Sequence, residues 1–256
     1  MSETKFEDIG LSPELVQAVS DMNYTQATGI QAQAIPLLMQ GADGIGRSST
    51  GTGKTAAFGI PAVERIESGL KAPQVLVLSP TRELAMQIAD EMRKFAKYNP
   101  GVCVAAVYGG APMDAQIRAL RAANIVIGTP GRVMDHMRRH TLKMEHVNMV
   151  VLDEADEMLN MGFLEDIEAI ISRVPETRQT LLFSATMPEA IKRIGVQFMK
   201  EPEHVKIAAK ELTTDLVDQY YIRVKEGEKF DTMTRLMDVE QPELAIVFGR
   251  TKRRVD

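Results

Sequence analysis

The stretch SSTGTGKT, residues 48–55, has residue types and a spacing that bind phosphate. A glycine-rich turn that leads into a helix points several backbone N–H groups and the positive end of the helix dipole into one small concavity. In such a turn Lys54 would reach the β- and γ-phosphates of a nucleotide, and the Thr55 hydroxyl would bind Mg²⁺. The usual pattern has Gly five residues before Gly53, where this chain has Ser48. The stretch therefore predicts a phosphate site, with one departure from the pattern.

A second group with metal chemistry follows an apolar run in VVLDEAD, residues 150–156. Asp153 would hold the magnesium ion, and Glu154 would orient or activate the water that attacks the phosphate. Taken alone, acidic residues after an apolar run are more often a solvated strand end. Together with the glycine-rich turn, they supply the two halves of a magnesium-nucleotide site.

Short apolar runs, each followed by a polar cluster and then by a helical pattern, recur along the chain and must position these residues. The runs cover residues 42–46, 74–80, 103–110, 124–130, 149–156 and 180–186. Between them, residues 82–97 and 162–174 place apolar side chains on one helical face. Alternating strands and helices predict an α/β fold with a parallel sheet covered on both faces. Ligands bind such sheets at the carboxyl ends of the strands, which is where the polar clusters lie.

The composition is that of an ordinary globular protein, with 45% hydrophobic and 25% charged residues among 256. The net charge of −5 disfavours broad electrostatic adhesion to nucleic acid, so any such contact must be local. No stretch approaches the roughly 18 apolar residues of a membrane helix, and the first residues contain no apolar signal core. We therefore expect a cytoplasmic protein without membrane contact. The single cysteine, Cys103, excludes a disulfide framework and is interpreted as a buried thiol.

Six motifs resemble, in order and rough spacing, those of the DEAD-box ATP-dependent RNA helicases. They are STGTGKT (49–55), PTRELA (80–85), Gly109-Gly110, TPGR (129–132), DEAD (153–156) and SAT (184–186). The resemblance spans nearly the whole chain. It implies a RecA-like parallel sheet with helices on both faces, followed by an incomplete second α/β lobe. It also implies ATP and Mg²⁺ as cofactors, and single-stranded or duplex RNA as a partner bound without sequence preference.

The resemblance assigns roles to individual residues. Those implied to bind nucleotide are Phe6, Tyr24, Gln31, Ser49, Thr50, Gly51, Thr52, Gly53, Lys54 and Thr55. Thr55 and Asp153 would hold Mg²⁺, while Glu154, Lys54 and Asp153 would be catalytic. The implied RNA contacts are Pro80, Thr81, Arg82, Gly109, Gly110, Thr129, Gly131 and Arg132, whose N–H, hydroxyl and guanidinium groups suit phosphates rather than bases. Ser184 and Thr186 would hydrogen-bond Asp156 and couple the nucleotide site to lobe closure, although a Ser/Thr turn at a strand end is locally as good an interpretation.

Adenine recognition in the family uses an aromatic residue followed seven positions later by Gln, a pattern that falls here on Tyr24 and Gln31, with Phe6 upstream. A Gln amide both donates to and accepts from the adenine edge, and an aromatic ring stacks on its face. The chain has ATGIQ at 27–31 where PTPIQ is usual. Without these two prolines we expect a more mobile loop and weaker nucleotide binding.

We expect three segments: an adenine-recognition segment at 1–35, a RecA-like ATP-binding domain at 36–210, and the incomplete start of a second lobe at 211–256. In the last segment, strands are expected at 216–224 and 243–249, around a helix at 228–239. The family's later motifs, whose arginines contact the γ-phosphate, have no counterpart there. Such arginines supply roughly 10³ to 10⁵ in rate in related enzymes. The chain alone is therefore expected to bind nucleotide but to hydrolyse it and unwind duplexes poorly.

Two other functions remain open on the sequence. A DNA translocase would use the same lobes, and DNA-stimulated turnover would point to it. A non-catalytic RNA or protein clamp would keep its function after Glu154 is replaced by Gln.

Overall fold

The computed structural model describes residues 4–47, 52–206, 218, 220–249 and 251. The chain divides into two compact units, Met1–Ala209 and Lys210–Asp256. The first unit contains the parallel sheet and all of the predicted site residues, so it positions the candidate site.

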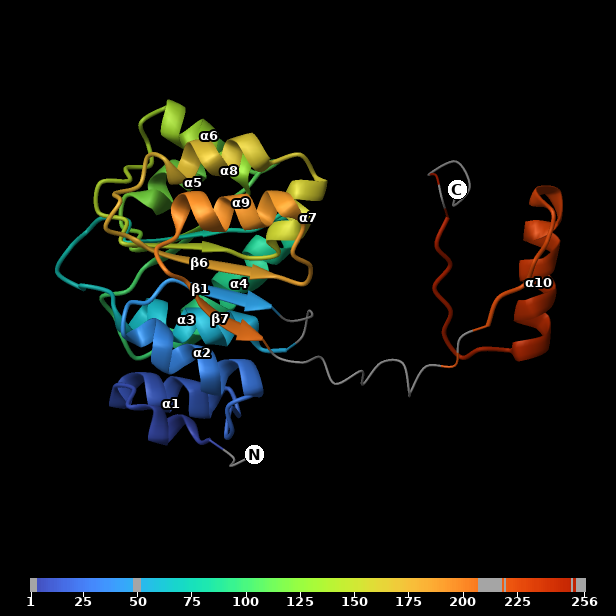
Figure 1. The fold of residues 1–256 in the computed structure, drawn as a ribbon, viewed down its shortest axis with the longest axis horizontal. Helices are drawn as coiled ribbons and strands as arrows, with labels where there is room; N and C mark the ends of the chain where they lie inside the picture. Colours follow the sequence, from blue (N-terminus) through green and yellow to red (C-terminus); the bar gives the residue numbers. More distant parts are fainter. Residues whose placement is uncertain (1–3, 48–51, 207–217, 219, 250, 252–256) are drawn as a thin grey trace. The chain divides into compact units, whose positions relative to one another are not determined.

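Seven strands form one sheet in the first unit, in the order β3-β4-β2-β5-β6-β1-β7. The strands are β1 (Gly44–Arg47), β2 (Val75–Leu78), β3 (Val104–Val107), β4 (Ile125–Gly128), β5 (Met149–Leu152), β6 (Gln179–Ser184) and β7 (Glu203–Lys206). Every neighbouring pair is parallel. All carboxyl ends therefore lie along one edge of the sheet, on the right in Figure 1. The predicted α/β fold with a parallel sheet is confirmed, and β7 is a strand that the sequence analysis did not predict.

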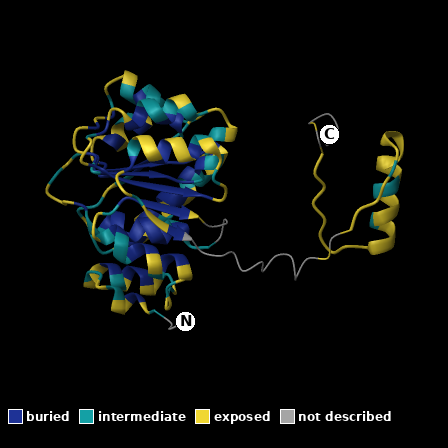
Figure 2. Cartoon of the chain, in the orientation of Figure 1, coloured by how far each residue is buried: buried dark blue, intermediate teal, exposed yellow. Residues whose placement is uncertain are grey.

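Helices cover both faces of this sheet (Figure 1). They are α1 (Pro13–Asp21), α2 (Gly29–Met39), α3 (Lys54–Glu64), α4 (Arg82–Phe95), α5 (Met113–Leu120), α6 (Pro130–Arg138), α7 (Ala155–Asn160), α8 (Leu164–Ile171) and α9 (Glu189–Phe198), with a 3-10 turn η1 (Phe6–Ile9). Side chains alternate along a buried strand, so Val75 and Val77 of β2 pack in one core while Leu76 and Leu78 pack in the other. The first core lies against α1 to α4 and the second against α5 to α9. Figure 2 shows the sheet as the buried centre of this unit.

The interpretation of Cys103 as a buried thiol is wrong, because the residue is exposed. It immediately precedes β3, which is an edge strand of the sheet. The apolar character of its neighbours indicated burial, but an edge position leaves the start of the strand open to solvent.

The second unit contains the short turn η2 (Glu226–Glu228) and helix α10 (Lys229–Glu240), which matches the helix expected at 228–239. Neither expected strand is formed among the described residues of 216–224 and 243–249. Large apolar side chains of this unit, such as Tyr220, Phe230 and Phe248, are exposed. Strands need neighbours to satisfy their backbone hydrogen bonds and to bury their side chains, and the described residues of this unit provide neither.

Candidate functional site

The predicted phosphate-binding turn lies at the carboxyl end of β1, directly before α3. Of this turn, the structure describes Thr52, Gly53, Lys54 and Thr55, and the predictions for Ser48, Ser49, Thr50 and Gly51 lie outside the described residues. Helix α3 begins at Lys54, and the preceding Gly53 has left-handed backbone angles (φ 88°, ψ 25°). Lys54 is buried, with 6% of its surface exposed. A buried ammonium group needs an anion, and Asp153 acts on it as an opposite charge in this site.

Two side chains of the predicted adenine-recognition segment hold the end of this turn. The Gln31 amide accepts a hydrogen bond from the Thr28 backbone N–H (2.9 Å) and donates one to the Gly53 carbonyl (3.2 Å). The Thr28 hydroxyl donates to the Thr52 carbonyl (3.0 Å). Gln31 is 3% exposed, and its observed partners are protein groups. Its contact with adenine stays a prediction. Thr28 was not predicted, although its Thr-x-x-Gln capping-box pattern before an apolar run was a signal in the sequence.

Replacing Gly53 with Ala should weaken Mg-ADP binding by about tenfold, because the αL backbone strain is about 1–2 kcal/mol for a residue with a Cβ. The added Cβ would lie 2.3 Å from Gln31 Nε2, so the hydrogen bond between the two segments would break as well. Titration of the chain with labelled ADP measures this. Gly69→Ala is the matched control, since a Cβ there meets nothing within 4 Å. Unchanged affinity of the Gly53 variant would mean that the Gln31 contact does not support the turn.

The two aromatic residues predicted near adenine stack on each other. The Phe6 and Tyr24 ring centroids are 6.1 Å apart, with an interplanar angle of 27°. Phe6 is 2% exposed and belongs to the core, whereas Tyr24 is half-buried. The structure thus places Phe6 beneath Tyr24, and of the two rings only Tyr24 has surface for a base to stack on.

Asp153 and Glu154 follow β5 at the same edge of the sheet. The Glu154 backbone N–H donates to Asp153 Oδ1 (3.0 Å), and Glu154 itself has a left-handed backbone (φ 51°) where α7 begins. Asp153 is 3% exposed, and burial raises its pKa to about 6. Burial is the largest cause of this raised pKa, and the Glu154 and Glu91 carboxylates also contribute to it, while Lys54 and the Glu154 N–H lower the pKa. A buried carboxylate under the influence of the Lys54 charge is therefore in place at the strand end.

Glu91 of α4 is a residue of this site that the sequence analysis missed. Burial raises the pKa of Glu91, and a hydrogen bond with the Thr55 side chain opposes the shift. Its charge also acts on Asp153 and Tyr24. In the sequence Glu91 is one charged residue of an amphipathic helix, so no local signal distinguishes it.

The donor set suits magnesium. The oxygen atoms available are the Thr55 hydroxyl and the Asp153 carboxylate, and Mg²⁺ is usually bound by one or two carboxylates together with waters and substrate phosphates. Across the described ranges, no group of three or more His, Cys, Asp or Glu residues is arranged to hold a metal ion.

The three predicted coupling residues meet at the carboxyl end of β6. Asp156 Oδ2 accepts hydrogen bonds from the backbone N–H and from the hydroxyl of Thr186, both at 2.8 Å. The Asp156 backbone N–H donates to the Ser184 hydroxyl (3.3 Å). Burial alone would raise the pKa of Asp156, but these bonds outweigh it and lower the pKa. The network joins the start of α7 to the end of β6, and its role in lobe closure stays a prediction.

The predicted RNA loops lie at the ends of β2, β3 and β4. The Arg82 guanidinium lies over the Tyr108 ring, 5.1 Å from its centroid, which brings the PTRELA and Gly-Gly loops together. Gly109 and Gly110 are exposed, Pro80 is buried, and Thr81 caps α4 by accepting from the Leu84 N–H (3.2 Å). In the third loop, Thr129 precedes α6, and Gly131 and Arg132 lie in its first turn.

Arg132 is held by the protein itself. Its Nη1 donates to the Ala111 carbonyl and to Gln116 Oε1, each at 3.1 Å. Gln116 Oε1 also lies 3.0 Å from His136 Nε2, and Gln116 Nε2 donates to the Tyr108 carbonyl. His136 is fully buried, and burial lowers its pKa. Gln116 and His136 were not predicted, and they tie the Gly-Gly and TPGR loops into one unit.

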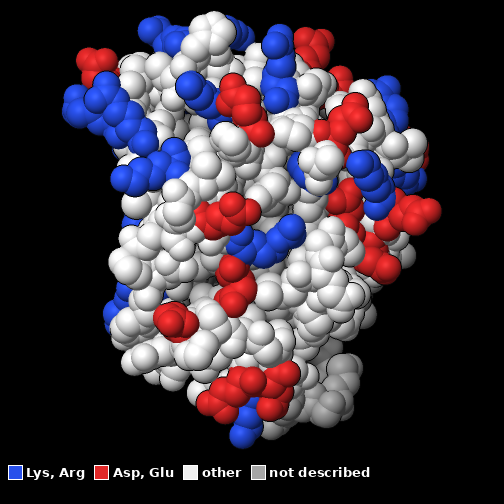
Figure 3. Space-filling view, turned by 90° about the vertical axis from the view of Figure 1, so that its left-hand side faces the viewer, with Lys and Arg blue, Asp and Glu red and all other residues white. Residues whose placement is uncertain are grey.

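The strand order separates two regions along one edge. The candidate phosphate, magnesium and coupling residues follow the neighbouring strands β1, β5 and β6, whereas the predicted RNA loops follow β3, β4 and β2. Another face of the unit, the left-hand side of Figure 1, carries cationic and anionic side chains interspersed, without one extended basic surface (Figure 3). In the part of the chain that the structure describes, no helix has the length and apolar character to cross a membrane.

Comparison with known proteins identifies relatives of the whole chain. The family model described as "DEAD/DEAH box helicase" matches residues 28–194. The chain is 64% identical over 253 residues to a DEAD-box ATP-dependent RNA helicase CshA of Streptococcus pneumoniae, covering 98% of this chain and 48% of that protein. A protein of the same name from Geobacillus kaustophilus is 57% identical, with 99% and 54% covered. The chain thus spans about half the length of the curated relatives it matches.

A solved structure agrees with the fold. The crystal structure of a DEAD box protein from the hyperthermophile Methanococcus jannaschii superposes with a TM-score of 0.77 at 39% sequence identity. The match covers 92% of this chain and 64% of that one.

Proposed function

Because the chain belongs to the DEAD/DEAH box helicase family, we propose that it is the nucleotide-binding part of an ATP-dependent RNA helicase. It binds Mg-ATP at the ends of β5, β6 and β1, and the backbone of RNA at the ends of β3, β4 and β2. The chain then consists of an adenine-recognition segment (1–35), an ATP-binding domain (36–210) and the start of a second lobe (211–256). We also propose that the protein acts in the cytoplasm, where RNA and ATP are both present.

One observation carries the nucleotide site: a buried lysine and a buried aspartate, whose charges attract each other, lie at the edge of the sheet where ligands of this fold class bind. Lys54 contacts the β- and γ-phosphates, and Thr55 and Asp153 hold Mg²⁺. When bound, Mg²⁺ supplies charge neutralisation at the phosphate oxygens. Glu154 orients or activates the attacking water by accepting its proton. Thr52 and Gly53 offer backbone N–H groups to the phosphates, as do Ser49, Thr50 and Gly51.

Adenine is read by Tyr24, which stacks on the base, and by Gln31, which binds its edge. The Gln31 amide has one N–H and one acceptor lone pair beyond the two observed bonds, which is what pairing with adenine requires. Base recognition and the phosphate turn are then linked through the same side chain, because Gln31 also holds Gly53.

RNA is held through its backbone by exposed groups of three loops. Arg82, Gly109 and Gly110 are exposed and adjacent, which supports phosphate contacts. Thr81, Thr129, Gly131 and Arg132 complete this surface, and Pro80, which is buried, contributes by shaping its loop. Since backbone groups carry no sequence information, binding is independent of sequence.

The first experiment is Mg-ATP hydrolysis by the chain with and without single-stranded RNA, together with ADP and GDP titrations. We expect tighter binding of ADP than of GDP and only slow turnover, because residues 211–256 contain no counterpart of the family's arginine fingers. Equal affinity for ADP and GDP would contradict the adenine site. Stimulation by DNA but not by RNA would favour a translocase, and robust duplex unwinding by the chain alone would overturn the expected weak activity.

A further inference from the structure

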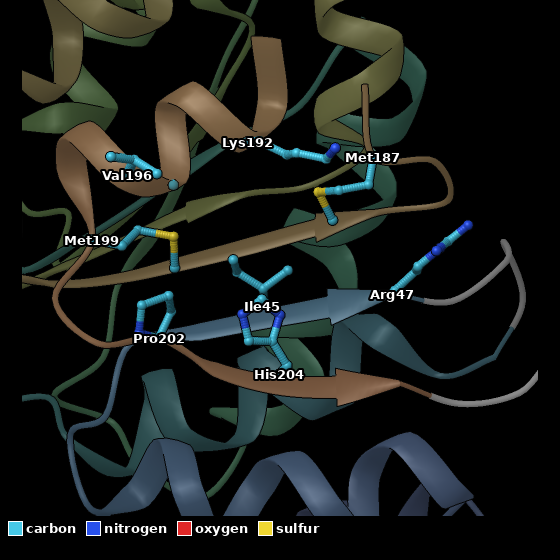
Figure 4. Close-up of a pocket in the computed structure, with 9 residues that line it drawn as sticks. Ile45, Arg47, Met187, Lys192, Val196, Met199, Pro202 and His204 are labelled. Carbon is cyan, nitrogen blue, oxygen red and sulfur yellow. The ribbon is translucent and has the colours of Figure 1, made fainter. Parts of the chain in front are cut away.

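A groove lies between α9 and the strands β1 and β7 (Figure 4), and its lining residues Arg47 and Met187 adjoin the phosphate turn and the SAT motif without belonging to them. Its volume is about 670 Å³, within the range of sites that bind ligands. Ile45 of β1 and Met199 after α9 form its floor, and His204 of β7 points into it. β7 has no strand on its other side among the described residues, so the groove lies at the open edge of the sheet.

Helix α9 presents a second stripe toward this groove, apart from the one that it buries. Ile191 and Ile194 are buried in the core. Lys192, Gly195 and Val196 line the groove at positions i, i+3 and i+4, which places them on one helical face, and Met199 lines it just after the helix. Gly195 and Met199 are themselves buried. Val196 is 87% exposed, although valine on a solvated face of a helix contributes neither packing nor helix propensity.

The groove owes its depth to Gly195. Glycine inside a helix is less stable than alanine, so its presence calls for a packing reason. A Cβ at Gly195 would lie 3.6 Å from Ile45 Cδ1 and 3.9 Å from Met199 Sδ, which are ordinary contact distances. The core therefore has room for alanine, and the missing side chain leaves space above Ile45 instead.

The polar side chains that line the groove are all of basic residue types. Arg47, Lys192 and His204 line it, and among the described residues that line the groove none is acidic. Arg47 forms no salt bridge with any residue that the structure describes. Among the residues that the structure describes, Lys192 pairs only with Glu189 (2.5 Å), a surface pair of two exposed side chains that exchanges readily.

We propose that this groove docks an acidic amphipathic segment of a partner protein. Apolar side chains of the segment would fill the space above Ile45, Gly195 and Met199, while its carboxylates would pair with Arg47, Lys192 and His204. The apolar floor disfavours nucleic acid, whose backbone would leave that floor unfilled. The groove and the nucleotide site share none of their side chains, so the proposal is independent of the proposed function.

The test uses two fluorescent amphipathic helical peptides of about 14 residues, each with the same apolar stripe, one flanked by Glu and the other by Lys. Anisotropy titration of the 256-residue chain should give a micromolar dissociation constant for the Glu peptide and binding at least about tenfold weaker for the Lys peptide. In NMR spectra the methyl groups of Ile45, Val196 and Met199 should shift. Equal binding of both peptides, or shifts elsewhere, would overturn the proposal.

Three variants complete the test. Gly195→Leu fills the floor and should weaken binding of the Glu peptide at least about tenfold, whereas Gln197→Leu, an exposed position on α9 outside the groove, should not. If Gly195→Leu fails to fold, Gly195→Ala should raise the melting temperature and still weaken binding. Unchanged peptide binding by every folded Gly195 variant would contradict the proposal. A dimer that forms with increasing concentration in light scattering and that these variants abolish would also contradict the proposal. In that case a second copy of the chain would occupy the groove.

Discussion

Replacing Glu154 with Gln should reduce RNA-stimulated hydrolysis of Mg-ATP by about 10²- to 10⁴-fold while leaving Mg-ADP affinity nearly unchanged. The substitution keeps the size and hydrogen-bonding capacity of the side chain but removes its ability to accept a proton from water. Glu154 has a left-handed backbone between Asp153 and α7, and an isosteric change leaves that turn intact. Binding should survive because the proposed phosphate and metal ligands are other residues.

The rate is measured on the chain joined to the remaining sequence of the Streptococcus pneumoniae relative, and affinity is measured on the 256-residue chain. Glu157→Gln is the matched control, since this exposed carboxylate lies one helical turn further along α7. Normal turnover of the Glu154 variant would remove Glu154 from the mechanism and favour a clamp. An equal loss of Mg-ADP affinity would show that Glu154 supports the site structurally instead.

Replacing Asp153 with Asn should stabilise the nucleotide-free chain at pH 7 and abolish the contribution of Mg²⁺ to ADP binding. The pKa of Asp153 is raised from 3.8 to about 6, a shift that corresponds to at most about 3 kcal/mol of unfolding free energy. For an acid with a raised pKa, the unfolded state loses its proton first. The contribution of Asp153 to the unfolding free energy therefore falls as the pH rises from 3.8 through about 6, and it is constant at higher pH. Asn stays neutral, so the variant should lack this pH dependence.

Urea unfolding at pH 4 and pH 8 measures the stability effect, and ADP titration with Mg²⁺ or EDTA measures the metal effect. The exposed Asp114 provides the control variant Asp114→Asn. A variant that is less stable than the parent at pH 8 would mean that the attraction between the charges of Asp153 and Lys54 outweighs the burial of the Asp153 charge. If Mg²⁺ still strengthened ADP binding to the Asp153 variant, the ion would be held elsewhere.

Much of the architecture was predictable because its signals are local. Six strands lie within the apolar runs of the sequence to within one residue, and α4 follows the helical pattern of residues 82–97. The carboxyl-edge position of the DEAD and SAT motifs also followed, since parallel strands bring their carboxyl ends to one edge. Local signals failed where a neighbour decides the outcome. Cys103 is exposed because β3 is an edge strand, and the described residues of 216–224 and 243–249 form no strand because no partner strand is paired with them.

The sequence by itself determined the residue chemistry of the site and the motifs that place the chain in its family. Only the tertiary structure decided which of these residues meet. It placed the nucleotide residues and the RNA loops on separate halves of one edge, brought Glu91 to Thr55, and bound Gln31 to Gly53. The physical reason is the separation along the chain of the residues that interact. Helix and strand patterns arise from residues a few positions apart, whereas strand order and side-chain contacts depend on packing between segments far apart in the chain.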